Sequence, residues 1–478
     1  MGLSLHGKAP QEKCVCTSEP LKERLFRLAR HKLAHDALAL YGVQLCRKAL
    51  PLIVIPYLTS VLRPAGWGLV AFMQSLAEFL VLAIEFGFSF SGTREIARCQ
   101  DNPQKCGEVM SGVLSAQAVL AFGCTICAAL IASRIPILRA HPLLVITGLC
   151  YAVFQGIAPL WFFQGLEQMK LCAVLEIVGK VAGCICIFVF IHSPEDTWKV
   201  LGFQALAPAI TSLLGLALAF RTIPCVRPRF HLFRAAFVQG WPMFLLRSGE
   251  SLYSVGNSFI LGLFVSTTYV GYFAGADKIA RAAFGLLIPI RDVLFARMSN
   301  LAARSFEKAE RLARHGMVLM AAGGVALGAV QWIFAPFIVR FLMGPEFAPA
   351  VAVLRIESAY PVLVAVTCSV GMQWLVPLGY DRMVLRTTLT AGIFNILLAT
   401  FLAPRFAHVG MAWGVITTEA FVCITFLIMV SRTCPLWGKR TPSREPQPET
   451  CETAQIGTVS AGSFPAGETP SIHVRGLN

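Results

Sequence analysis

The chain is dominated by long apolar runs. About twelve of them approach the roughly 20 residues that a helix needs to cross the hydrocarbon core of a membrane. Inside that core every backbone polar group must be satisfied within the protein, so runs of this length are predicted to be helices. Charged residues make up only 14% of the chain, against about 25% in a soluble domain. The sequence therefore predicts an all-α integral membrane protein. The predicted spans are 37–62, 67–91, 109–132, 142–163, 170–191, 198–220, 236–264, 270–295, 315–342, 350–377, 384–403 and 409–431.

Three polar segments organise these spans. Residues 1–36 form a basic arm without an apolar stretch of signal-peptide length, and residues 432–478 form a Pro-, Thr- and Ser-rich tail that we expect to be disordered. The basic connector 221–235 leaves six spans in residues 37–220 and six in residues 236–431. We therefore expect two six-helix lobes around a central cavity.

A short internal repeat supports this division. Residues 61–72, VLRPAGWGLVAF, resemble residues 264–275, FVSTTYVGYFAG, in a register that aligns Gly68 with Gly271. Two repeats of six spans have the same orientation in the membrane, so an axis along the membrane normal would relate them.

Lys and Arg residues alternate between the loops on the two sides of the predicted spans. Most lie in the amino-terminal arm, the connector, the start of the tail and the loops 92–108, 297–315 and 378–386. By the positive-inside rule this side is cytoplasmic, with both termini. The net charge of +15 then reflects membrane topology rather than nucleic-acid binding. Within the arm, residues 21–33 are either an amphipathic helix on an anionic membrane surface or part of a solvated tail.

The sixteen cysteines do not indicate a metal site. Most lie inside predicted spans, where cysteine acts as a small apolar residue. Cys14 and Cys16 lack a second pair with zinc-ligand spacing. We expect no metal and no bound cofactor.

Several charged residues fall inside the predicted spans. Each costs about 2.5–3.5 kcal/mol on insertion scales, so such residues are expected to face a cavity or one another. The cations are Arg47, Lys48, Lys180, Arg247, Lys278 and Arg281, and the carboxylates we identify are Glu78, Glu176, Glu250 and Asp277. On this count cations exceed carboxylates. A net-positive cavity suits an anionic substrate, and the arginine fork suits phosphate in particular.

These charges also have a purely structural interpretation. Glu176 with Lys180, Arg247 with Glu250, and Asp277 with Arg281 are spaced so that each pair could neutralise itself on one helix face. We nevertheless place Arg281 first among candidate substrate contacts, because it lies near the middle of its predicted span. Glu78, Glu250 and Asp277 are candidates for coupling transport to H⁺ or Na⁺.

Three motifs resemble one known family. WFFQGLEQM at 161–169, YFAGADKIARA at 272–282 and EFGFSFSGTREIAR at 85–98 are similar to stretches of Wzx-type O-antigen and polysaccharide flippases. The resemblance covers about residues 37–431 and leaves out the basic arm and the tail. This family belongs to the multidrug/oligosaccharidyl-lipid/polysaccharide exporter superfamily.

The resemblance implies a transporter rather than an enzyme. It implies that an undecaprenyl-pyrophosphate-linked oligosaccharide crosses the bacterial inner membrane by alternating access, during synthesis of lipopolysaccharide O-antigen or exopolysaccharide. Membrane lipids would be partners, with a polysaccharide polymerase and a chain-length regulator as further ones. A lateral opening between the first and eighth helices would leave the lipid tail in the bilayer.

Other functions remain open at this point. A drug or cation exporter of the same superfamily would need a surplus of carboxylates at mid-membrane. A lipid II flippase would be expected to carry two further helices where this chain has its polar tail. A membrane-embedded polymerase would need a large periplasmic loop, and the predicted periplasmic connections are short.

Overall fold

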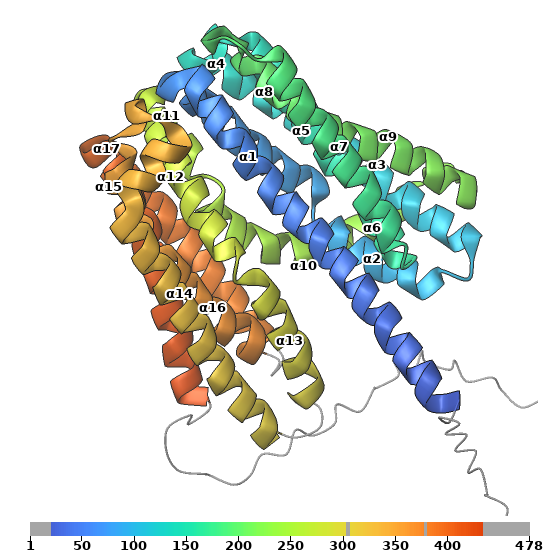
Figure 1. Ribbon diagram of the computed structural model, residues 1–478. Coiled ribbons are helices and arrows are strands. Elements are labelled where there is room, and N and C mark those ends of the chain that lie inside the picture. Colours follow the sequence, from blue (N-terminus) through green and yellow to red (C-terminus); the bar gives the residue numbers. More distant parts are fainter. Residues whose placement is uncertain (1–20, 303–305, 377–379, 434–478) are drawn as a thin grey trace, which may run out of the picture. The chain divides into compact units, whose positions relative to one another are not determined.

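The computed structural model describes residues 21–302, 306–376 and 380–433. For residues 21–52, and at a few further positions, it describes the backbone alone. Within these ranges the chain is helical and contains no strand (Figure 1). The predicted arm up to residue 20 and the predicted tail from residue 434 lie outside the described residues.

Helices occupy every predicted span. The first half of the chain contains α1 (Leu21–Glu85), α2 (Phe88–Cys99), α3 (Pro103–Arg134), α4 (Pro136–Ala140), α5 (Pro142–Ile157), α6 (Leu160–Gly165), α7 (Met169–Phe190), α8 (Thr197–Gln204) and α9 (Leu206–Thr222). The second half contains α10 (Phe230–Ser254), α11 (Asn257–Phe264), α12 (Thr267–Gly285), α13 (Ile288–Ala302), α14 (Phe306–Met343), α15 (Ala350–Glu357), α16 (Tyr360–Val370) and α17 (Asp381–Thr433). Short 3₁₀ or π turns lie at Pro194–Asp196, Pro345–Phe347 and Gly371–Leu375.

The two longest helices each contain two predicted spans. α1 is interrupted at Arg63, where φ is 56°, and α17 at Ala407, where φ is 47°. Both interruptions fall in the predicted gaps, between residues 62 and 67 and between residues 403 and 409. Pro64 gives the physical reason in α1, because the residue before a proline is disfavoured in helical conformation.

Several other spans consist of two helices rather than one. The predicted span 236–264 is divided between α10 and α11, and the span 270–295 between α12 and α13. The second break comes at Leu286, just ahead of Pro289. Pro242, by contrast, lies inside α10 without ending it.

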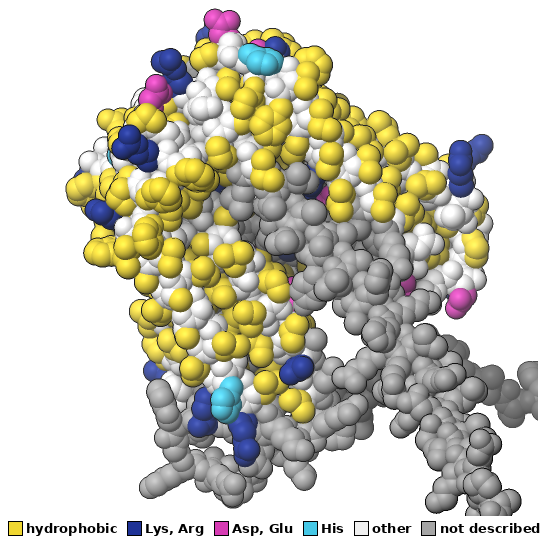
Figure 2. Space-filling model, in the orientation of Figure 1, with side chains coloured by type: hydrophobic (Ala, Val, Ile, Leu, Met, Phe, Trp, Pro, Cys, Tyr) yellow, Lys and Arg dark blue, Asp and Glu magenta, His cyan; other side chains and the backbone are white. Residues whose placement is uncertain are grey.

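The outward surface is that of a membrane protein. Seven helical stretches within the described residues are long and apolar enough to cross a membrane. Arg382–Arg432 contains two predicted spans, and Ile53–Cys99 contains the span 67–91 with the end of the span 37–62. Large apolar side chains such as Phe122 and Phe341 point outward, with exposures of 70% and 73%. Figure 2 shows apolar side chains over most of one face, with Lys and Arg near its margins. The predicted multi-span helical membrane architecture is confirmed.

The two halves pack backbone against backbone where the second part of α1 meets the start of α12. A Cβ atom on Gly68 would collide with the carbonyl of Thr267 and lie 2.6 Å from the nitrogen of Gly271. A Cβ atom on Gly271 would collide with the carbonyl of Pro64. In the register of the internal repeat Pro64 matches Thr267 and Gly68 matches Gly271, so the contact is reciprocal. A two-fold axis passing between two repeats produces a contact of this kind.

Two of the family-like motifs also have a structural role. In the 161–169 motif, Trp161, Phe162 and Phe163 are all buried, at 2% exposure or less. The carbonyl of Trp161 accepts a hydrogen bond from Thr93, in the 85–98 motif, at 3.1 Å. These motifs therefore join α6 to α2.

Candidate functional site

The charged residues of α12 divide between two of its faces. Asp277 and Arg281 are one helical turn apart and share a face, whereas Lys278 is rotated by about 100° from Asp277. α12 packs against α1 as well as against α15, α16 and α17, so the two faces meet different partners. Asp277 and Arg281 therefore have a different environment from Lys278.

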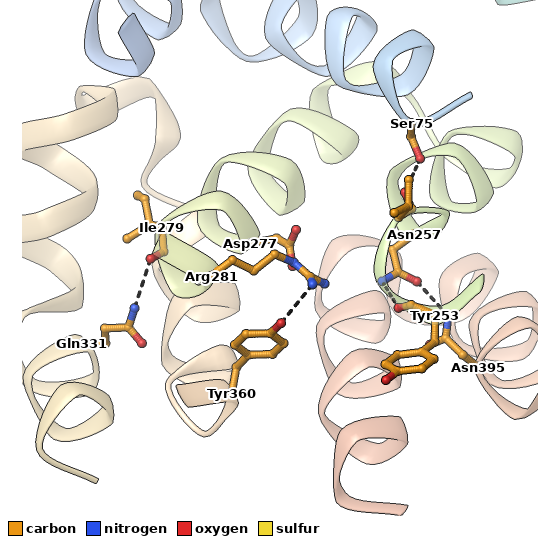
Figure 3. Close-up of polar contacts among 10 residues, drawn as sticks. Ser75, Tyr253, Asn257, Asp277, Ile279, Arg281, Gln331, Tyr360 and Asn395 are labelled. Atoms are coloured by element: carbon orange, nitrogen blue, oxygen red, sulfur yellow. Dashed lines mark hydrogen bonds and ion pairs between the residues drawn. The ribbon is translucent and has the colours of Figure 1, made fainter. Parts of the chain in front are cut away.

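The first face carries an arginine that has hydrogen-bond partners at two of its three side-chain nitrogens. Arg281 Nε donates a hydrogen bond to Asp277 Oδ1 at 2.7 Å, and Nη1 donates to the hydroxyl of Tyr360 at 3.1 Å (Figure 3). The guanidinium carbon also lies 4.9 Å from the centroid of the Tyr360 ring. This arrangement favours a structural role for Arg281, holding α12 to α16.

Two buried carboxylates surround this arginine and were absent from our sequence-based count. Glu357 ends α15 at 1% exposure, and Glu419 lies in α17 at 4% exposure. Both act electrostatically on Arg281. Both also fall inside predicted spans, 350–377 and 409–431, so the same rule that selected the other charges would have found them.

The predicted surplus of cations at mid-membrane is therefore wrong. Glu357 and Glu419 belong among the intramembrane carboxylates, and Glu85 joins them as the partner of a predicted cation. With these three included, the selected set contains seven carboxylates and six cations. The charge count alone does not indicate an anionic substrate.

A neutral polar network lies beside this cluster, at the break between α10 and α11. Asn257 donates to the carbonyl of Tyr253 at 2.9 Å and accepts from Asn395 at 2.8 Å (Figure 3). Thr418 in turn donates to Asn395 at 3.2 Å. On the α1 side, Ser75 donates to the carbonyl of Val255. The network satisfies backbone groups that the helix break would otherwise leave unpaired.

The second face of α12 points toward α1. Lys278 Nζ donates a hydrogen bond to Gln74 Oε1 at 3.0 Å and lies 4.5 Å from the centroid of the Trp67 ring. The Gln74 side chain lies 3.5 Å from Gln204 in α8. One turn along α1, Glu78 accepts a hydrogen bond from the hydroxyl of Tyr151 at 2.7 Å. We call Gln74, Glu78, Tyr151, Gln204 and Lys278 the polar strip; all five are half-buried.

Lys278 differs from the other cations in its partners. Within the described residues it has no carboxylate at ion-pair distance, and its hydrogen bond goes to a neutral amide. Its charge is therefore less fully neutralised than that of Arg281.

Arg247 pairs with a different residue from the one suggested by its spacing. Its Nη1 donates to Glu85 Oε1 at 2.6 Å and lies 3.3 Å from the Ser89 hydroxyl. Glu250, the expected partner, is exposed. The alternative in which Arg247 pairs with Glu250 is wrong, because Arg247 of α10 pairs with Glu85 of α1 instead.

The remaining predicted cations add less to the site. Lys180 forms the expected pair with Glu176 at 2.7 Å on the surface of α7. Arg47 and Lys48 lie in α1, but their side chains are outside the described part of the chain. The structure therefore brings Lys278 and Glu78 together, and groups Asp277 with Arg281.

The sequence profile of the family described as "Polysaccharide biosynthesis protein" matches residues 33–302, which is more than half of the chain. The chain belongs to this family. The resemblance to polysaccharide flippases that the three motifs suggested is confirmed at this level.

Two curated relatives carry the same name. The chain is 28% identical to a "Putative O-antigen transporter" of Escherichia coli (strain K12), over 83% of this chain and 96% of the relative. It is 26% identical to a "Putative O-antigen transporter" of Shigella dysenteriae, over 82% and 98% of the two chains. The similarity of this polysaccharide biosynthesis protein thus extends over almost the whole of each relative.

Two solved structures share its fold. One is the lipid II flippase MurJ in an inward closed conformation, with a TM-score of 0.64, 11% identity, and coverage of 83% of this chain and 87% of the other. The second is an inward-facing multidrug resistance MATE family transporter of the MOP superfamily, with a TM-score of 0.60, 16% identity, and coverage of 80% and 98%. The predicted transporter fold is confirmed.

Proposed function

We propose that this polysaccharide biosynthesis protein is a flippase that moves a polyprenyl-pyrophosphate-linked oligosaccharide across a membrane. The observation that carries the proposal is the environment of Lys278. Its ammonium group lies in a half-buried polar strip between the two halves of the chain, and its hydrogen bond goes to an amide. Ionisable residues inside a membrane-spanning bundle commonly mark substrate or ion pathways.

The strip matches both chemical parts of such a substrate. The Lys278 ammonium supplies the positive charge that a pyrophosphate needs. The amides of Gln74 and Gln204 and the hydroxyl of Tyr151 supply the neutral donors and acceptors that sugar hydroxyls need. The polyprenyl tail would remain in the lipid.

The transport mechanism in this proposal is alternating access. The reciprocal contact of Gly68 and Gly271 holds the halves together where the second part of α1 and helix α12 both begin. The Lys and Arg distribution of the loops assigns that end of the helices to the periplasm. Transport would require this contact to open while the opposite end closes.

The same distribution supports a place in the bacterial inner membrane with both termini in the cytoplasm. A polysaccharide polymerase and a chain-length regulator are the protein partners that this location and substrate imply. No ATP is required in this scheme, and an H⁺ or Na⁺ gradient would drive the cycle.

The carboxylates near Arg281 remove one argument against a rival function, that of a cation exporter. A surplus of cations no longer argues against a cation exporter, because Glu85, Glu357 and Glu419 alter the count. The position of Lys278 still favours an anion in the strip. Competition between ligands therefore separates the two functions.

The test uses the full-length protein in lipid nanodiscs and a polyprenyl pyrophosphate as the probe. We expect the wild type to bind it, Lys278→Met to bind at least about tenfold more weakly, and Lys278→Arg to recover part of the loss, since a hydrogen bond to a charged group contributes about 1.5–3 kcal/mol. Lys105→Met, which removes an exposed lysine, is the matched control. Competition by an organic cation but not by pyrophosphate, or normal binding by Lys278→Met, would contradict the proposal.

A further inference from the structure

Glu357 is the most unusual buried group in the part of the chain that the structure describes. It is the last residue of α15 and has 1% exposure. Neither of its carboxylate oxygens has a hydrogen-bond partner. An ionised carboxylate in this state would be far more costly than a neutral carboxylic acid, which has only one unsatisfied O–H group.

The groups that face Glu357 do not neutralise it. α12 contributes Asp277 and Arg281; Arg281 donates to Asp277 and to Tyr360 of α16, and its remaining Nη2 makes no hydrogen bond to Glu357. α17 contributes Glu419, a further carboxylate that acts on Arg281. On α14, the uncharged Gln331 donates to the carbonyl of Ile279 in α12. Three carboxylates therefore share one guanidinium, so a further positive charge is needed.

A metal ion does not fit this requirement. Within the described residues no three His, Cys, Asp or Glu side chains lie close enough together to hold one. A proton needs only a single carboxylate oxygen. The charge that completes the cluster is therefore best supplied by a proton.

We infer that Glu357 is a proton-binding site and that α12 links its occupancy to the polar strip. This inference rests in its second part on the proposed function. On loading, a water-borne proton forms an O–H bond with the carboxylate; on release, the O–H bond breaks and the proton returns to water with the electron pair left on oxygen. The proton is the only ligand required.

α12 provides the connection between the two sites. Its one face carries Asp277 and Arg281, which act on Glu357, and its other face carries Lys278, which donates to Gln74. α12 is therefore the element through which a charge change at Glu357 would act on Lys278. A proton adds a positive charge beside α12 and so favours an anion at Lys278, and by linkage the anion favours the proton to the same extent.

The first experiment detects the proton directly. The full-length protein in liposomes is studied by infrared difference spectroscopy between two pH values. We expect a carbonyl band from a protonated carboxyl group that Glu357→Gln removes, while Glu419→Gln and the exposed control Glu195→Gln retain it. Glu357→Asp should shift the band rather than remove it. A band that persists in Glu357→Gln, or a Na⁺-dependent change at constant pH that Glu357→Gln removes, would overturn the inference.

The second experiment tests the link to the strip. Binding of a polyprenyl pyrophosphate by the wild type should tighten about fivefold or more as the pH is lowered, in the usual range of coupling between sites. Glu357→Gln should bind tightly with this pH dependence lost. Equal pH dependence in both proteins would refute the link. If the wild type binds no polyprenyl pyrophosphate, the proposed function fails, and the infrared band still decides the proton site.

Discussion

The two faces of α12 carry cations in opposite situations. Arg281 is enclosed by Asp277 and Tyr360 in the second half of the chain, with every donor group but one directed at a partner. Lys278, three residues earlier, reaches across to Gln74 and Trp67 of α1. The two residues lie at similar depth in the membrane, so depth does not explain the difference. The difference lies in their hydrogen-bond partners, a carboxylate and a hydroxyl for Arg281 and an amide for Lys278.

This comparison shows how an intramembrane charge should be interpreted. A cation that already has a carboxylate and a hydroxyl contributes to the fold, and a ligand would have to displace those groups. A cation held by an amide can exchange that contact for a ligand oxygen at small cost. The proposed ligand contact therefore moves from Arg281 to Lys278.

Replacing Arg281 should have the largest effect on stability. Arg281→Met leaves Asp277 buried without its partner, and breaking such a pair costs about 3–5 kcal/mol. Lys278→Met is the matched control and should cost about 1 kcal/mol, the contribution of one hydrogen bond. The free energy of unfolding in mixed micelles, measured by denaturation with SDS, checks both values. Equal losses in the two variants would remove the distinction between the faces.

Replacing Gly271 tests the contact on the α1 side and should have an intermediate effect. Gly271→Ala places a methyl group against the carbonyl of Pro64, and overpacking of this kind costs about 1–3 kcal/mol. Gly68→Ala should cost a similar amount because the contact is reciprocal. Gly123→Ala, where a Cβ atom meets nothing within 4 Å, is the control. A clear inequality between Gly68→Ala and Gly271→Ala in the same unfolding assay would argue against the two-fold relation.

Replacing Lys180 should have the smallest effect. Its pair with Glu176 joins two residues of one helix, and replacing both members of an ion pair by uncharged residues is often close to neutral. The double variant Lys180→Met, Glu176→Gln should therefore leave the unfolding free energy and polyprenyl pyrophosphate binding nearly unchanged. A loss of binding comparable to that of Lys278→Met would place Lys180 in the ligand site.

The sequence was most informative where the membrane restricts the options. Spans such as 67–91 and 384–403 could be predicted because apolar length and internal hydrogen bonding leave the helix as the spanning structure. The gaps at Arg63 and Ala407 were predicted for the same reason. The register of Gly68 and Gly271 was predicted as a repeat, but their contact with each other was not.

The pairing of charges was less predictable because it depends on distant segments. Arg247 was matched with nearby Glu250, whereas its partner Glu85 lies on α1 in the first half of the chain. Spacing along a helix reports only local neighbours. Glu357 and Glu419 could have been found from their positions in predicted spans, but their convergence on Arg281 required the arrangement of α12, α15 and α17.

The reciprocal contact of Gly68 with Gly271 bears on how the two six-span halves would behave as separate fragments. A surface that meets its own equivalent across a two-fold axis is complementary to itself, as in a symmetric dimer. A six-span fragment carrying Gly68 would therefore display a face suited to a second copy of that fragment. Two separately produced halves should likewise find each other in the membrane without the covalent connector.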